Sequence, residues 1–131
     1  MRLILWVRTF FLIVFLFGCE KEDLDIEEGV YKGKFTVIYS SGPQTGETTL
    51  ELKDGRFSCS GNSDKIPAGG SGTYSFNDGK ITFNDENYWT ADFDWNLISH
   101  GRYSYTLDGK RLKISAEKKG FGQYIYDLEK E

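Results

Sequence analysis

The chain has 131 residues, with 20 acidic and 16 basic side chains and a formal net charge of −4 at pH 7. This length predicts one folded domain, since a domain takes about 100–200 residues. The excess of acidic residues argues against binding of nucleic acid and against electrostatic binding to anionic lipid, because both need basic patches.

The N-terminus has the pattern of an export signal. Arg2 and Arg8 precede the apolar run FFLIVFLFG at residues 10–18, and Cys19 follows directly. A charged start, a short apolar stretch and a small residue before the cleavage point are typical of a secretory signal peptide. The uninterrupted apolar stretch at residues 9–18 is shorter than the roughly 20 residues of a spanning helix. An uncleaved membrane anchor is the alternative.

The residues LFGC at 16–19 resemble the lipobox of bacterial lipoproteins, with Phe17 where a small residue is usual. This resemblance implies that residues 1–18 are a signal peptide and that Cys19 becomes a lipidated N-terminus, with a diacylglyceryl thioether and acyl chains such as palmitate. Each buried CH₂ of an acyl chain contributes about 0.8 kcal/mol, and more than one chain gives stable anchoring. We therefore expect an outer-membrane lipoprotein, on the periplasmic or the cell-surface face, held to the membrane by the lipid on Cys19.

An acidic segment follows, with six acids and one lysine in residues 20–28. Like charges keep such a segment extended and solvated. We expect residues 19–28 to be the lipidated cysteine and a tether, and residues 29–131 to be the folded domain. The acidic run also resembles the export signal of some Gram-negative surface lipoproteins, and a plain linker is the alternative. Loss of Arg2 and Arg8 would leave 14 basic against 20 acidic residues, a net charge of −6.

Beyond residue 28, apolar and polar residues alternate with the period of two that half-buried strands show. We expect eight strands, at residues 29–39, 46–53, 56–60, 72–77, 80–84, 97–107, 111–116 and 123–129. The side chains expected to face the core are Tyr31, Phe35, Val37, Leu50, Phe57, Tyr74, Phe83, Tyr103, Leu112, Ile114 and Tyr126. Cys59 shares a face with Phe57, which predicts a buried thiol.

Three Asp-Gly pairs separate neighbouring strands, at residues 54–55, 78–79 and 108–109. Asp-Gly between alternating apolar runs predicts a type I′ hairpin, because both residues tolerate a positive φ. The other connections are longer, at residues 40–46, 61–71, 84–95 and 117–122. In a meander, successive connections alternate between the two ends of the sheet. The three tight turns then lie at one end, where the chain also enters the first strand and leaves the last, and the longer loops lie at the opposite end.

Eight meandering strands must bury one face and leave no open edge, and an all-β, eight-stranded antiparallel up-and-down barrel satisfies both needs. A two-sheet β-sandwich with the same hairpins is the alternative. The interior of such a barrel is either filled by side chains or holds one small ligand. The chain resembles the lipocalin-like small lipoproteins of Gram-negative bacteria through GVYKG at 29–33, GSGTY at 70–74, the Asp-Gly hairpins and YIYDL at 124–128. This resemblance implies a lipocalin-like barrel and says little about activity.

The sequence contains no catalytic constellation. His100 is the only histidine, and neither a GxSxG nor an HExxH motif occurs. The spacing Asp92-x-Asp94-x-Asn96 imitates half of a calcium loop, but Leu97 and Tyr103 occupy the positions that need Gly and Glu. We therefore expect no enzyme activity, no cofactor and no metal site.

Aromatic residues gather in the connection after the strand at 80–84, namely Tyr88, Trp89, Phe93 and Trp95, and Phe121 belongs to the same predicted end. These side chains either plug the barrel or line an opening. Convergent aromatics with a few polar groups suit a small apolar or glycan ligand. We expect a monomeric binding module with its site at these five residues. The alternative is a protein-interaction or inhibitor barrel, because GSGTY and KITF at 80–83 resemble membrane-bound lysozyme inhibitors.

Overall fold

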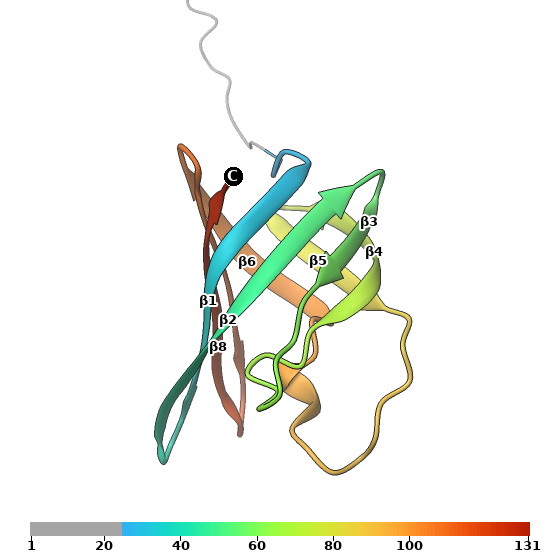
Figure 1. The fold of residues 1–131 in the computed structure, drawn as a ribbon. Coiled ribbons are helices and arrows are strands. Elements are labelled where there is room, and N and C mark those ends of the chain that lie inside the picture. The colour runs from blue at the N-terminus through green and yellow to red at the C-terminus, as the bar shows by residue number, and fades with distance from the viewer. Residues whose placement is uncertain (1–24) are drawn as a thin grey trace, which may run out of the picture.

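Eight antiparallel strands pair in chain order and close into a barrel (Figure 1) in the computed structural model, which describes residues 25–131. The strands are β1 (Gly29–Tyr39), β2 (Gly42–Lys53), β3 (Arg56–Cys59), β4 (Gly70–Asn77), β5 (Lys80–Asp85), β6 (Gly101–Asp108), β7 (Arg111–Lys118) and β8 (Gly122–Lys130). The barrel closes because β8 pairs with β1, from Tyr31 opposite Lys130 to Ile38 opposite Gln123. This confirms the up-and-down barrel and rules out the two-sheet sandwich.

The predicted signal peptide at residues 1–18, the lipidation site at Cys19 and residues 20–24 of the tether lie outside the described residues. Within residues 25–131, no helix has the length and the apolar character that a membrane crossing requires.

Side chains pack the middle of the barrel. Ten of the eleven residues predicted to face inward are buried, and Tyr74 is half-buried. Aromatic rings meet edge on or tilted across the interior, with centroid distances of 4.7 Å for Phe35–Tyr126, 6.0 Å for Tyr126–Tyr103 and 5.7 Å for Tyr103–Phe83. The barrel interior is therefore filled by side chains and is not the hollow, ligand-holding alternative.

The packed part of the chain begins before the first strand. Ile26 is only 3% exposed and belongs to the hydrophobic core. The backbone oxygen of Glu27 accepts a hydrogen bond from the Tyr31 hydroxyl at 2.6 Å, and its carboxylate pairs with Lys130 at 2.7 Å. Residues 26–28 are therefore docked on the domain, three residues earlier than the predicted boundary at residue 29.

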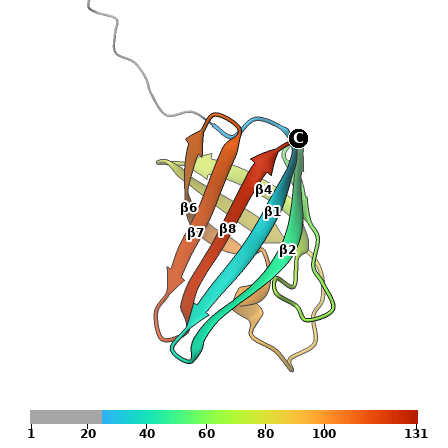
Figure 2. The ribbon, with the colours of Figure 1, turned by 60° about the vertical axis from the view of Figure 1, so that its left-hand side comes forward.

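Three tight hairpins lie at the end where the chain enters β1 and leaves β8 (Figure 2). The pairs at 54–55 and 78–79 have positive φ at both residues, as a type I′ turn requires. The third hairpin is shifted by one residue, because Asp108 pairs with Arg111 and the turn residues are 109–110. Gly109 then takes the first central position with φ 61°, the glycine position of a type II′ turn.

At the opposite end, the predicted connection at 40–46 is wrong. Tyr39 pairs with Gly42, so the turn has two residues and β2 begins four residues earlier than predicted. Pro43 stands opposite Ile38, outside the stretch of β2 at 50–53 that pairs with β3. Proline is tolerated at such an edge position, because its missing N–H would face away from the partner strand.

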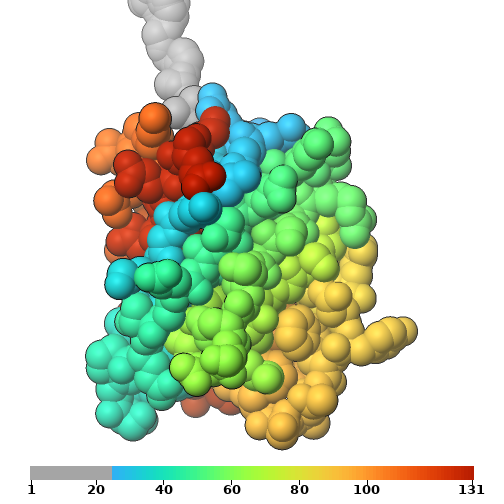
Figure 3. All heavy atoms as spheres, in the orientation of Figure 1, coloured from blue at the N-terminus to red at the C-terminus, as the bar shows by residue number. Residues whose placement is uncertain are grey.

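The predicted start of the sixth strand at residue 97 is also wrong, since β6 starts at Gly101. Residues 95–97 form a 3₁₀ turn, and Ile98 makes an isolated parallel bridge to Gly69. This bridge joins two loops that lie side by side at the lower end of the barrel, the β3–β4 loop (60–69) and the β5–β6 loop (86–100) (Figure 3). Leu97 O accepts from Ala68 N at 2.9 Å, and Gly69 O accepts from Ser99 N at 2.9 Å.

The joined loops close this end of the barrel with aliphatic side chains. Ile66, Leu97 and Ile98 are 8%, 4% and 4% exposed. Ile66 and Leu97 belong to the hydrophobic core and form what we call the aliphatic plug, whereas Ile98 is buried outside that core. Because the plug occupies the mouth, the tryptophans of the β5–β6 loop are left outside the barrel interior.

Candidate functional site

A cleft of about 440 Å³ opens outside the aliphatic plug, between the β5–β6 loop and the ends of β6 and β7. We call it the aromatic cleft. Ile98 and Gly101 contribute to its inner surface, and Tyr88, Trp89 and Trp95 supply three aromatic rings. Its polar lining residues are Asp85, Asn87, Asn96, His100 and Lys118. Such a volume and mixture of groups are typical of small-molecule sites.

Both indoles of the cleft are held by hydrogen bonds inside the loop itself. Trp89 Nε1 donates to Asp85 Oδ2 at 2.6 Å, and Trp95 Nε1 donates to the Thr90 carbonyl at 2.7 Å. Phe93 packs edge on against Trp89, with ring centroids 6.0 Å apart. The polar atom of each indole is thus already paired, and Trp95 is still 55% exposed. The ring positions are therefore fixed before any ligand arrives.

Asp85, at the end of β5, organises this side of the cleft. Its Oδ1 accepts from Ser71 N at 3.0 Å and from Asn87 Nδ2 at 2.7 Å, while its Oδ2 accepts from Trp89 Nε1 and, at 3.3 Å, from Asn87 N. With four donors converging on the carboxylate, Asp85 positions the cleft and has little remaining capacity to bind a ligand.

His100 presents a hydrogen-bond donor to the cleft. Its Nδ1 accepts from the Asp85 backbone N–H at 3.0 Å, so the neutral ring carries its proton on Nε2. His100 is exposed, as its place between apolar positions predicts, although it lies just before β6 and not within a strand.

The β5–β6 loop is fastened across the barrel mouth by Asp94. Its Oδ2 accepts from Tyr39 OH at 2.8 Å and from Tyr124 OH at 2.7 Å, and its Oδ1 accepts from Asn96 N at 3.0 Å at the start of the 3₁₀ turn. Asp94, Tyr39 and Tyr124 form what we call the loop latch, which ties the loop to β1 and β8.

The electrostatics of the loop latch follow from burial and these hydrogen bonds. Burial by itself would raise the pKa of Asp94, but the bonds from Tyr124, Asn96 and Tyr39 outweigh it and lower that pKa. Burial first, and then the hydrogen bond to Asp94, raise the pKa of Tyr39 to about 12 and push that of Tyr124 higher still. The latch therefore holds an ionised carboxylate between two neutral phenols.

The five residues predicted to bind a ligand are only partly brought together. Tyr88, Trp89 and Trp95 line the aromatic cleft. Phe93 supports Trp89 from outside that lining and has the Lys65 ammonium 5.5 Å from its ring centroid. Phe121 lies in the β7–β8 turn, is 61% exposed and is not part of the cleft.

Sequence reasoning missed Lys118, the last residue of β7, which also lines the cleft. The signal was present, because Leu112, Ile114 and Ala116 form an inward row that Lys118 continues. The predicted strand ends at residue 116, so Lys118 falls in the predicted connection at 117–122, whereas β7 extends to Lys118.

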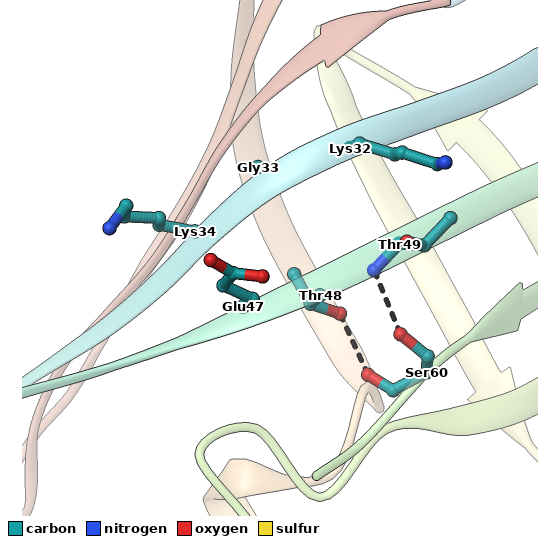
Figure 4. Close-up of a pocket in the computed structure, with 7 residues that line it drawn as sticks. All are labelled: Lys32, Gly33, Lys34, Glu47, Thr48, Thr49 and Ser60. Carbon is teal, nitrogen blue, oxygen red and sulfur yellow. Dashed lines mark hydrogen bonds between the residues drawn. The ribbon is translucent and has the colours of Figure 1, made fainter.

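A second depression, of about 470 Å³, lies on the outer wall over β1 and β2 (Figure 4). Its wall is held by Thr48 Oγ1 donating to Ser60 O at 2.7 Å and Thr49 N donating to Ser60 Oγ at 2.9 Å. Lys32 and Lys34 point away from one another, and Lys32 is paired with Glu131 outside the depression at 2.8 Å. None of its seven lining residues is aromatic. It has the character of a gap between surface side chains, so the aromatic cleft is the better candidate site.

Within residues 25–131, no group of three or more His, Cys, Asp or Glu side chains is placed to hold a metal ion. Comparisons of the chain with protein-family models, with curated proteins and with solved structures found no match.

Proposed function

We propose that this protein is a lipid-anchored, non-catalytic binding module whose aromatic cleft takes a small apolar or glycan ligand. The observation that carries the proposal is the fixed pair of indoles, whose N–H groups are bonded to Asp85 and Thr90 and whose rings border an open cleft. Because the rings are fixed in advance, these side chains lose less conformational entropy when a ligand binds. Aromatic faces suit flat apolar ligands and the apolar faces of sugar rings.

The position of the cleft fits a membrane anchor at the N-terminus. Residues 26–28 dock at the end of the barrel that holds the tight hairpins, whereas the cleft lies near the opposite end. An anchor on Cys19 would therefore direct the cleft away from the membrane surface, toward dissolved or cell-wall ligands.

The ligand proposal is tested with purified full-length protein, a glycan array and isothermal titration calorimetry of the hits. Trp95→Ala removes an exposed ring of the cleft and should weaken binding about tenfold while leaving the unfolding midpoint nearly unchanged. Phe121→Ala is the matched control, because it removes a similarly exposed ring outside the cleft. Equal effects of the two substitutions, or no effect of either, would remove the cleft as the binding site.

The anchor is tested separately, by mass spectrometry of the mature N-terminus. An acylated Cys19 at the N-terminus, and release of a Cys19→Ser variant from the membrane fraction, are expected. Wild-type protein that keeps an unacylated residue 1–18 segment would contradict the lipoprotein proposal.

A protein partner is the second candidate, favoured by the amount of exposed apolar surface at this end. Tyr88 is fully exposed, and Trp95, Phe121 and Ile38 are 55%, 61% and 40% exposed. A small ligand in the cleft would leave Phe121 and Ile38 uncovered, because neither lines it. If the barrel is an inhibitor, purified protein should inhibit lysozyme, and Phe121→Ala should weaken inhibition as much as Trp95→Ala does.

A further inference from the structure

Lys118 places a cation at the inner side of the aromatic cleft. Its ammonium lies 5.1 Å from the centroid of the buried Tyr103 ring, and its side chain is only partly exposed. Its backbone oxygen accepts from Phe121 N at 2.8 Å in the β7–β8 turn, which fixes where the side chain starts. The cation is therefore part of the cleft wall, unlike the exposed lysines of the outer surface.

Gly101 makes room for this ammonium. A Cβ built on Gly101 would come within 3.1 Å of Lys118 Nζ, closer than most such contacts. Gly101 has φ 108°, a conformation that side chains other than glycine rarely adopt. The first residue of β6 thus leaves a space that the ammonium reaches from β7.

No carboxylate of residues 25–131 lies within 4.0 Å of Lys118 Nζ, whereas Lys32 and Lys130 each pair with a glutamate. The acidic residue that lines the cleft, Asp85, already accepts hydrogen bonds from four donors. His100 adds a second donor through Nε2. Lys118 and His100 therefore give the cleft two hydrogen-bond donors, one of them charged, which is an arrangement that recognises an anion.

We infer that the ligand of the aromatic cleft is an acidic sugar, whose ring lies against Trp95 and whose anionic group is bound by Lys118 and His100. This inference rests on the proposed function and narrows it to one class of ligand. A neutral apolar ligand would take the ammonium out of water and offer it neither an anion nor a hydrogen-bond acceptor, which costs free energy. The anionic group of the sugar forms charge-assisted hydrogen bonds with Lys118. Because the protein as a whole is acidic, we expect the preference for an anion to depend on this lysine.

The test compares two probes that differ only at C6, methyl β-D-glucuronide and methyl β-D-glucopyranoside, with purified full-length protein and ligand-observed NMR. We expect the glucuronide to bind about tenfold more tightly, as one charge-assisted hydrogen bond allows. Lys118→Met keeps the length of the side chain and should remove that preference. Lys113→Met takes the same charge from the outer face of β7 and should retain it. Methyl β-D-glucopyranoside 6-sulfate separates recognition of a carboxylate from recognition of any anion.

The outcomes separate this inference from the proposed function. Equal binding of both probes, lost in Trp95→Ala, would overturn the acidic-sugar inference and leave the cleft as a glycan site. A glucuronide preference that survives in Lys118→Met and disappears in Lys113→Met would also overturn the inference, since the selective charge would then lie outside the cleft. Binding of neither probe would overturn the inference, and the glycan array would then decide the proposed function alone.

Discussion

Removal of the Asp94 carboxylate should loosen the β5–β6 loop, because three hydrogen bonds end on this carboxylate. Asp94→Ala deprives the hydroxyls of Tyr39 and Tyr124 of their shared acceptor and removes the cap of the 3₁₀ turn at Asn96 N. Tyr124 is buried as a residue and Tyr39 is half-buried, so water can replace the lost acceptor only in part.

The magnitude follows from the bonds that are lost. A hydrogen bond to a charged group contributes about 1.5–3 kcal/mol, and a cap about 1 kcal/mol. Asp94 is partly exposed and its bonds share one carboxylate, so we take a combined loss of about 3 kcal/mol. For a domain of this size, that loss lowers the melting temperature by about 10–20 °C.

Chemical denaturation of the purified protein, followed by circular dichroism, measures this loss. Asp92→Ala is the matched control, because the exposed Asp92 side chain accepts a hydrogen bond from Thr90 on the loop surface and has no bond to the barrel strands. Asp94→Asn should fall between the two, since it keeps one acceptor oxygen. Equal unfolding midpoints for Asp94→Ala and Asp92→Ala would refute the loop latch as a source of stability.

Three further predictions concern the latch at high pH, the core and the buried thiol. The pKa of Tyr39 is raised from its ordinary value of 10.0 to about 12 in the folded protein. The contribution of neutral Tyr39 to stability is therefore fully present below pH 10, the pKa of the unfolded chain. Stability should therefore decline as pH rises from 10 to about 12, and the decline should be smaller in Tyr39→Phe; equal urea midpoints across this range in the wild type would contradict the assignment. Phe83→Ala should cost about 3–5 kcal/mol in urea denaturation, because Phe83 is 2% exposed and packs on Phe57 and Tyr103 at 4.7 and 5.7 Å; a loss below 1 kcal/mol would mean that the site is not closely packed. Burial raises the pKa of the Cys59 thiol, so iodoacetamide should modify it only in denaturant, and rapid modification of the folded protein would contradict its buried position.

The strand pattern and the hairpins could be predicted from the sequence because both depend on neighbours in the chain. The alternation at residues 29–39 predicts the bounds of β1, and the inward residues follow from its period of two. The Asp-Gly pairs at 54–55 and 78–79 also form the expected turns, since their backbone preference is local. The predicted loop at 40–46 was wrong, because pairing of β2 with β1 continues through Pro43. This pairing outweighs the local tendency of the Gly-Pro sequence to interrupt a strand.

The location of the aromatic residues was decided only by the tertiary structure. Sequence reasoning left open whether Trp89 and Trp95 plug the barrel or line a cleft, because both positions suit aromatic side chains. The outcome depends on Ile66, which comes from another loop and joins the hydrophobic core at the mouth together with Leu97.

The same limit applies to the polar groups of the site. Asp94 meets Tyr39 and Tyr124 across 55 and 30 residues of chain, and Lys118 meets the cleft because Gly101, on another strand, leaves space for its ammonium. Periodicity reports which face of a strand a side chain occupies, but not which loop folds over that face. Local sequence therefore determined the barrel, whereas contacts between distant segments, each stabilised only once the barrel has closed, decided the cleft.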